Sequence, residues 1–194
     1  MLTHLNKYKI VLASQSPRRQ ELLQGLNISF EIRNIEVEET FPKGIVGVDI
    51  PKFLAEKKAA AFDKWMDDNT LLITADTIVW HEGKVFGKPK DKEEATAMLK
   101  ALSGKTHQVI TGVCISTHKR RKVFSVISEV RFAKLTNKEI NYYLEHYKPY
   151  DKAGGYGVQE WIGFVGVEFI EGSYFNVMGL PVQRLYNELK NWKD

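Results

Sequence analysis

The sequence has one cysteine among 194 residues and no apolar run that approaches the length of a membrane span. A single cysteine cannot form an internal disulfide, and no cluster of His and Cys has the spacing of a zinc site. Cys114 lies inside an apolar run, so we expect a buried structural thiol rather than a nucleophile. The N-terminal sequence MLTHLNKYKI lacks the apolar core of a secretory signal. These absences predict a cytoplasmic protein.

The excess of one sign of charge over the other is also small: 28 Lys and Arg against 24 Asp and Glu give a formal net charge of +4. This positive excess is too small and too dispersed to indicate a protein that binds duplex nucleic acid, but it is compatible with binding of an anionic small molecule. The densest basic run, residues 119–122, lies between two strand-like stretches and is expected to solvate the tip of a hairpin. The chain has no internal repeat and no low-complexity linker. We therefore expect a single domain over residues 1–194.

The stretch with the clearest chemistry is residues 10–23, IVLASQSPRRQELL. Its apolar start predicts a strand buried on both faces, and Ser16 followed by Pro17 predicts the start of a helix. Arg18 and Arg19 then fall in the first helical turn, where cations are unfavourable by roughly a few tenths of a kcal/mol. Two guanidinium groups beside free N–H groups and serine hydroxyls can bind an anion. The alternative is that both arginines point to solvent.

Two further charged residues lie next to predicted strands. Asp76 comes directly after the apolar strand 71–75, which places it at the carboxyl end of a central strand, where open α/β sheets hold ligands. The alternative for Asp76 is a residue that only starts a turn. Lys88 lies in a loop restrained by Pro89, where its ammonium could meet a phosphate.

Residues 151–157, DKAGGYG, contain three glycines within four positions, which lets backbone N–H groups approach a ligand closely. The same glycines are compatible with an ordinary turn. Gln159 follows, and its amide can both donate to and accept from a pyrimidine base. The segment 103–106, SGKT, looks like the end of a P-loop. The first glycine of that motif would fall at Leu99, inside a predicted helix, so a P-loop is excluded.

The order of predicted elements indicates an α/β protein with a mixed twisted sheet and flanking helices, in two lobes around a cleft. Strands are predicted over 10–12, 28–35, 71–75, 78–80, 84–86, 107–117, 123–132 and 162–170. Helices are predicted from Pro17, over 49–66, from Asp91 to 103, from Thr136 to 147, and at the C-terminus. Asp91 with Glu94 is expected to start its helix like a capping box, and Thr136 with Glu139 is expected to form a second capping box. Loops are predicted over 149–157 and 172–181.

Taken in order, these segments resemble the Maf family of nucleoside triphosphate pyrophosphatases over residues 10–185. The motifs that carry the resemblance are LASQSPRRQELL, VEET, LAEKKA, TADTIV, GKPKD, SGKTHQVITGV, DKAGGYGVQ and GSYFNVMGLPV. The form DKAGGYGVQ is similar to the branch that acts on dTTP and UTP, whereas the branch acting on 7-methyl-GTP has a different loop. The resemblance implies a Maf/ITPase-like fold and a hydrolase that releases a nucleoside monophosphate and pyrophosphate.

The resemblance also implies roles for individual residues. It implies phosphate contacts at five side chains: Ser14, Arg18, Arg19, Lys58 and Lys88. It implies a divalent cation, Mg²⁺ or Mn²⁺, and the attacking water at two carboxylates, Glu39 and Asp76, which with Lys88 are the expected catalytic residues. It implies base choice at three positions: Arg18, Thr77 and Gln159.

Two details of this assignment stay open. Lys57 precedes Lys58, so the choice of lysine depends on the alignment of LAEKKA. Asp76 could act as a general base or as a metal ligand, and a free Asp, with a pKa of about 4, is a poor base at neutral pH.

The expected function is hydrolysis of dTTP, UTP and related modified pyrimidine triphosphates in nucleotide house-cleaning. One alternative is the same chemistry on 7-methyl-GTP or CTP. Another is a non-catalytic nucleotide- or nucleic-acid-binding protein that acts in cell division, and the lack of an aromatic and basic stacking face counts against it. The expected partner is the triphosphate, with no nucleic acid and no membrane, and the resemblance implies a possible homodimer.

Overall fold

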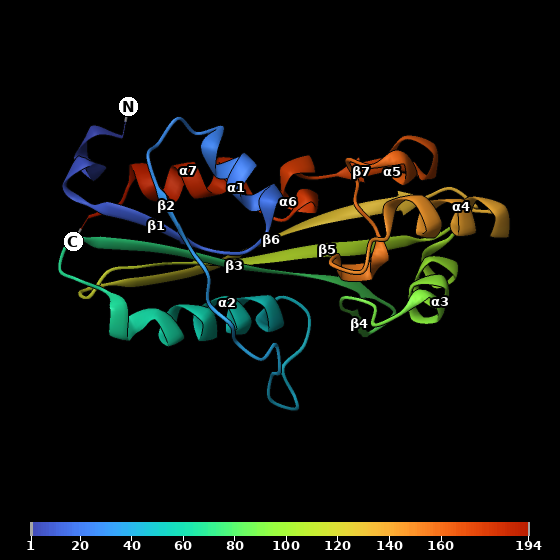
Figure 1. Ribbon diagram of the computed structural model, residues 1–194, viewed down its shortest axis with the longest axis horizontal. Helices are drawn as coiled ribbons and strands as arrows, with labels where there is room; N and C mark the ends of the chain where they lie inside the picture. Colours follow the sequence, from blue (N-terminus) through green and yellow to red (C-terminus); the bar gives the residue numbers. More distant parts are fainter. Residues whose placement is uncertain (1, 194) are drawn as a thin grey trace. The chain divides into compact units, whose positions relative to one another are not determined.

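The computed structural model describes residues 2–193, which form a seven-stranded mixed sheet with helices beside it (Figure 1). The strands are β1 (Lys9–Ala13), β2 (Glu31–Arg33), β3 (Thr70–His81), β4 (Lys84–Phe86), β5 (Thr106–Ser116), β6 (Arg121–Phe132) and β7 (Val167–Glu171). Their order is β2-β1-β3-β5-β6-β7, with β4 paired to β3. β1 is parallel to β2 and β3, whereas β3–β4 and β6–β7 are antiparallel. The predicted mixed α/β sheet with flanking helices is confirmed.

The α-helices are α1 (Pro17–Gln24), α2 (Asp49–Phe62), α3 (Lys92–Leu102), α4 (Asn137–Tyr147), α5 (Trp161–Gly166), α6 (Tyr174–Met178) and α7 (Val182–Lys190). Short 3₁₀ helices are η1 (Thr3–Lys7), η2 (Asp63–Trp65) and η3 (Ala153–Gly155). Within residues 2–193, none of the helices combines the length and the apolarity that a membrane span requires.

The chain divides into two compact units. Unit 1 comprises residues 2–76, 111–126 and 179–193, and unit 2 comprises residues 77–110 and 127–178. Strands β3, β5 and β6 each contribute residues to both units, because the divisions fall within them. The single domain expected over the whole chain stays a prediction.

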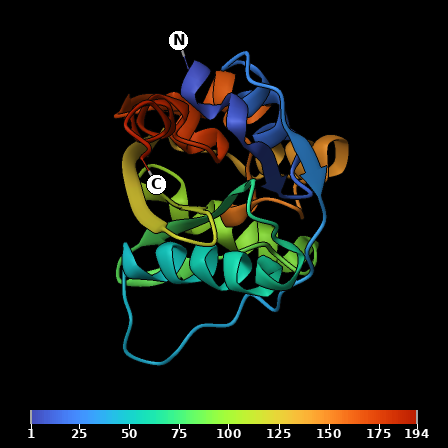
Figure 2. The same ribbon diagram turned by 90° about the vertical axis from the view of Figure 1, so that its left-hand side faces the viewer.

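In unit 1, α1 and α7 cover one face of the sheet and α2 covers the other (Figures 1 and 2). The core beneath α2 consists of small and apolar side chains: Val11, Ala13, Ala55, Ala59, Phe62, Leu72 and Cys114. Cys114 is fully buried, and burial raises the pKa of its thiol to about 12, so the predicted structural thiol is confirmed. Gly112 of β5 lets α2 approach closely, because a Cβ there would lie 2.3 Å from the backbone of Pro51.

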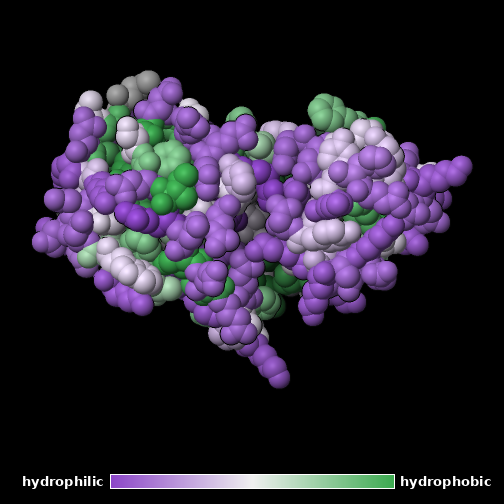
Figure 3. Space-filling view, in the orientation of Figure 1, coloured by the Kyte–Doolittle hydropathy of each residue, from purple (hydrophilic) through white to green (hydrophobic). Residues whose placement is uncertain are grey.

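In unit 2, the core gathers side chains from β3, β5, β6, α3, α4, α5 and the glycine-rich segment: Val79, Ala95, Leu99, Leu102, Val109, Val130, Phe132, Ile140, Tyr143, Leu144, Tyr156, Val158 and Ile162. The caps predicted for α3 and α4 are confirmed. Asp91 Oδ1 accepts a hydrogen bond from the Glu94 N–H at 2.8 Å, and Thr136 forms a reciprocal capping box with Glu139. Hydrophilic side chains dominate the molecular face in Figure 3, with apolar ones in small patches.

Strand β3 does not end at Ala75, as predicted, but continues to His81. Asp76 therefore lies within the strand rather than after it. The residues that follow, TIVW, are β-branched or aromatic and favour an extended backbone, which explains the continuation. The predicted strand over residues 28–35 is also shorter than expected, because only Glu31–Arg33 pairs with β1.

The prediction of a strand over 162–170 is wrong in its first half, where α5 forms. The helical turn brings Gly163 so close to Val158 that a Cβ would lie 1.8 Å from the Val158 carbonyl oxygen. The predicted loop 172–181 contains helix α6. Its buried residue Asn176 donates hydrogen bonds to the Val109 carbonyl at 3.1 Å and to Ser128 Oγ at 3.0 Å. The second difference arises from long-range contacts of Asn176 that override local propensity.

A buried histidine lies in the core of unit 2. His107 Nε2 and Tyr156 Oη share a hydrogen bond of 2.7 Å, and the His107 ring meets Phe132 edge-on with centroids 5.1 Å apart. Burial, with a smaller contribution from His81, lowers the pKa of His107 to about 3. This imidazole is therefore neutral in the folded protein throughout the physiological range.

We expect acid to destabilise the protein through His107. In the unfolded chain this histidine gains a proton near its ordinary pKa of 6.5, while the folded state stays neutral down to about pH 3. Stability is therefore unaffected above pH 6.5 and falls with decreasing pH below it, by about 1.4 kcal/mol per pH unit. In His107→Gln, the free energy of unfolding measured with urea should fall less steeply between about pH 6 and 4. The difference from the unaltered protein should correspond to the uptake of about one proton fewer on unfolding.

The matched control for this measurement is Tyr156→Phe, which removes the partner hydroxyl and keeps the imidazole. In this control the free energy of unfolding should depend on pH as it does in the unaltered protein. The same pH dependence in His107→Gln would contradict the prediction.

Candidate active site

Three charged side chains meet in unit 1. Lys58 Nζ lies 2.9 Å from Glu39 Oε1 and 2.5 Å from Asp76 Oδ1. The side chains of Lys58 and Asp76 are only 13% and 8% exposed, whereas that of Glu39 is 39% exposed. We call these three residues the Lys58 cluster. It is a largely buried ammonium held between two carboxylates.

The docking of α2 on β3 explains how the Lys58 cluster forms. Thr74 Oγ1 donates a 2.6 Å hydrogen bond to the Ala55 carbonyl and anchors the helix on the strand. Asp76 lies two residues beyond Thr74 and thus on the same face of β3. Lys58 lies three residues beyond Ala55 and thus on the same face of α2. The anchor therefore brings the ammonium and the carboxylate together.

The neighbouring lysine has a different role that sequence reasoning missed. Lys57 Nζ donates hydrogen bonds to the carbonyls of Glu38 and Thr40 at 2.8 and 3.0 Å. It fixes the acidic loop, residues 36–40, which carries Glu39. Its third acceptor is Thr40 Oγ1 at 3.1 Å, and because the other two are backbone carbonyls, residue types in the sequence do not signal the contact. Of the two lysines, it is Lys58 that the structure brings to both carboxylates.

Arg19 of α1 contributes positive charge that interacts with the two carboxylates of this cluster. Arg19 is half-buried, and its Nε donates a 2.8 Å hydrogen bond to the Gly179 carbonyl. Burial lowers the pKa of Arg19, the charge of Asp76 opposes that shift, Arg18 adds to it and Glu39 opposes it. Asp76, Glu39 and Arg18 therefore all act electrostatically on Arg19. A guanidinium group nevertheless stays charged at neutral pH.

Ser14 lies in the turn between β1 and α1 and is buried. Its Oγ accepts a hydrogen bond from the Ser16 N–H at 3.2 Å, and its carbonyl accepts one from Gln20 Nε2 at 3.2 Å. Pro17 begins the helix as predicted, but Ser16, at the N-cap position, makes no side-chain cap hydrogen bond. In this turn it is therefore the Ser14 hydroxyl, and not that of Ser16, that accepts a hydrogen bond from a backbone N–H.

Unit 2 contains the other three expected site residues. Thr77 follows Asp76 on β3, with its side chain on the opposite face of the strand. Lys88 is exposed in the loop after β4, and that loop is bound to the glycine-rich segment because the Gly154 N–H donates to the Gly87 carbonyl at 2.9 Å. Gln159 Oε1 is buried and has no hydrogen-bond partner within the described residues. An unpaired buried acceptor costs about 1–3 kcal/mol, so this oxygen is suited to a ligand donor.

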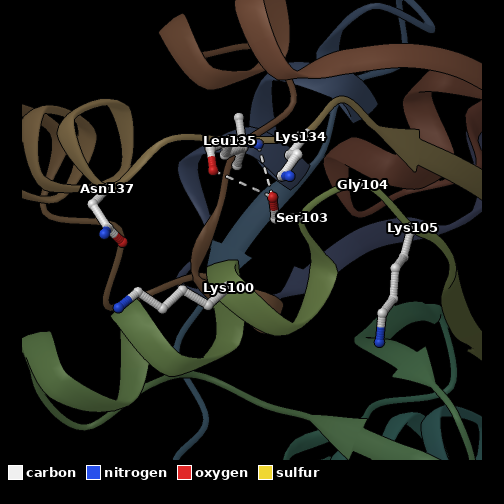
Figure 4. Close-up of a pocket in the computed structure, with 7 residues that line it drawn as sticks. All are labelled: Lys100, Ser103, Gly104, Lys105, Lys134, Leu135 and Asn137. Atoms are coloured by element: carbon white, nitrogen blue, oxygen red, sulfur yellow. Dashed lines mark hydrogen bonds between the residues drawn. The ribbon is translucent and has the colours of Figure 1, made fainter.

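A separate cavity of about 700 Å³ in unit 2 contains none of these residues (Figure 4). It is lined by Lys100, Ser103, Gly104, Lys105, Lys134, Leu135 and Asn137. Ser103 Oγ accepts a 2.7 Å hydrogen bond from the Leu135 N–H and so joins the end of α3 to the segment before α4. The SGKT segment ends a helix and begins a strand, which is the reverse of the strand-to-helix turn of a P-loop.

The comparisons with known proteins agree with the motifs. The family model described as Maf-like protein matches residues 9–192. A dTTP/UTP pyrophosphatase of Bacteroides fragilis is 58% identical over 98% of this chain and 99% of its own length. A protein of the same name from Parabacteroides distasonis is 61% identical over 99% of this chain and 100% of its own length.

Among solved structures, the Ham1 protein of Staphylococcus aureus is 17% identical and has a TM-score of 0.48, over 64% of this chain and 72% of that one. This loose likeness adds nothing to the assignment, which rests on the family match and on the close relatives. The chain belongs to the Maf family.

Proposed function

We propose that this chain hydrolyses dTTP, UTP and related modified pyrimidine triphosphates to the nucleoside monophosphate and pyrophosphate. The observation that carries the proposal is the Lys58 cluster, whose two carboxylates act electrostatically on Arg19. Paired carboxylates and several cations in one place are what the hydrolysis of a polyphosphate requires. The relatives named dTTP/UTP pyrophosphatase, at 58% and 61% identity, support this reaction and these bases.

The basic residues are proposed to bind the triphosphate, which carries about four negative charges. Arg18, Arg19 and Ser14 would contact phosphate oxygens at the start of α1, where backbone N–H groups also favour an anion. Burial already disfavours the charged form of Arg19, so a phosphate beside it would offset that cost. Lys58 and Lys88 would supply further contacts.

The carboxylates of Glu39 and Asp76 are the groups that would hold a divalent cation, Mg²⁺ or Mn²⁺. They fit such an ion because their oxygens converge on one ammonium, which shows that the place attracts positive charge. Within residues 2–193 there is no group of three or more His, Cys, Asp or Glu side chains suited to a metal. Mg²⁺ often takes only one or two carboxylates together with water and substrate phosphates. Once bound, the cation would supply charge stabilisation and an activated water.

Gln159 is proposed to select the base, with Thr77 as a further contact. The buried Oε1 of Gln159 is an acceptor without a protein donor. Thymine and uracil present an N3–H donor that could satisfy it, whereas cytosine presents an acceptor at the same position. A site built to accept from a donor rejects a base that lacks one. This argument favours dTTP and UTP over CTP.

The proposal is tested by a panel of dTTP, UTP, dCTP, CTP, 7-methyl-GTP and ATP, each with Mg²⁺, Mn²⁺ or EDTA. We expect pyrophosphate release to be fastest with dTTP and UTP and to stop in EDTA. Failure to release pyrophosphate from any triphosphate would overturn the proposal, and salt-dependent binding of oligonucleotides would then favour the non-catalytic alternative. A preference for 7-methyl-GTP or CTP would keep the reaction and change the base. The cytoplasmic location and the homodimer stay predictions.

A further inference from the structure

We propose that Tyr143, Lys152 and Glu160 are positioning residues that fix Gln159 and thereby determine base selectivity. The inference rests on the proposed function, because it takes Gln159 as the residue that reads the base. All four residues belong to unit 2. None of the three was singled out from the sequence for this role.

The carboxylate of Glu160 is held from two sides. Glu160 occupies the N-cap position of α5, yet its side chain makes no cap hydrogen bond. Instead its Oε2 accepts a hydrogen bond from Tyr143 Oη, and its Oε1 lies 3.0 Å from Lys152 Nζ. The side chains of Glu160 and Lys152 are only 18% and 10% exposed. A cap residue normally stabilises its own helix, but this one ties the helix start to α4 and to Lys152.

Tyr143 binds both ends of the short segment that contains Gln159. It is fully buried on α4, and its Oη accepts a 2.9 Å hydrogen bond from the Gly157 N–H while donating to Glu160. Burial, reinforced by Glu160, raises the pKa of Tyr143 above its usual value, so the hydroxyl keeps its proton. One hydroxyl therefore fixes residues 157 and 160, with Gln159 between them.

The packing at Gly157 leaves this segment little freedom. A Cβ on Gly157 would lie 2.8 Å from Glu160 Cδ and 3.0 Å from Lys152 Cε. The Glu160 N–H also donates to the Gly157 carbonyl at 3.0 Å. Val158 is buried in the core, so both neighbours of Gln159 are fixed. Hydrogen bonds weaken steeply with misalignment, and a fixed backbone is therefore what a single amide needs in order to distinguish bases.

The test compares dTTP with dCTP, whose phosphates and sugar are the same. Tyr143→Phe removes the shared hydroxyl and keeps the ring. We expect the ratio of kcat/KM for dTTP over dCTP to fall about tenfold, chiefly through a higher KM for dTTP, with kcat nearly unchanged. The matched control is Tyr147→Phe, one turn along α4, whose ring stacks on Tyr143 with centroids 5.2 Å apart. This control should keep the ratio of the unaltered enzyme.

Lys152→Met and Glu160→Gln alter the other partners of the same contacts, and they replace Tyr143→Phe in the test if that variant does not fold. Both should lower the ratio, and the double variant Tyr143→Phe/Glu160→Gln should lose less than the product of the single losses. An unchanged ratio in the folded variants would overturn the inference. This includes the case in which kcat/KM falls equally for dTTP and dCTP, which is what a purely structural role produces. Absence of triphosphate hydrolysis by the unaltered enzyme would instead count against the proposed function.

Discussion

Asp76→Asn should abolish turnover of dTTP and UTP while the protein stays folded. Asparagine has the same size as aspartate, and its Oδ1 can still accept a hydrogen bond from Lys58. The negative charge is lost, and with it the ability to hold a cation or to take a proton from water. We expect kcat/KM to fall on the order of 10³-fold or more.

Pyrophosphate release measures the loss, and thermal unfolding establishes that the variant is folded. Asp91→Asn is a matched control, because Asp91 is an exposed cap on α3 and lies outside the proposed site. Near-normal hydrolysis by Asp76→Asn would remove Asp76 from the active site.

Lys58→Met should have the next largest effect, because it removes the cation that Glu39 and Asp76 share. Asp76 is nearly buried, and a buried carboxylate without a partner costs roughly 3 kcal/mol of stability. Activity should fall by about 10²-fold or more, since the phosphates lose a positioned ammonium. Both losses are measured on one preparation, by urea unfolding and by the rate of pyrophosphate release.

The control for Lys58→Met is Lys52→Met on the same helix. Lys52 lies 2.7 Å from Asp49, whose side chain is 58% exposed, and such surface pairs contribute little. Equal activity of the two variants would show that the position of Lys58 between the carboxylates has no part in the reaction.

The sequence predicted well those elements that local chemistry determines. The capping box of Thr136 and Glu139 lies within four consecutive residues and needs no tertiary contact to form. The strand pair β5 and β6 follows from long runs of strand-forming residues on either side of a short basic tip. Cys114 is buried because its neighbours on β5 are apolar.

The sequence predicted poorly what depends on distant contacts. Helix α6 forms where Asn176 reaches Val109 and Ser128, which lie far away in the sequence. The different roles of Lys57 and Lys58 depend on how α2 lies on the sheet and on the path of the acidic loop. Site residues came from motif resemblance, because residue types alone leave several lysines and carboxylates equivalent. The distinction between them is geometric.

The continuity of β3 has a consequence for engineering. Asp76 is carried by the interior of a twelve-residue strand, whereas Gln159 is carried by a glycine-rich connection. Exchanging that connection for the equivalent piece of a relative would leave Asp76, the proposed catalytic carboxylate, on its own strand. With the roles proposed for Gln159 and Asp76, new nucleotide preferences can therefore be sought by grafting this connection while the strand that carries Asp76 is left unchanged.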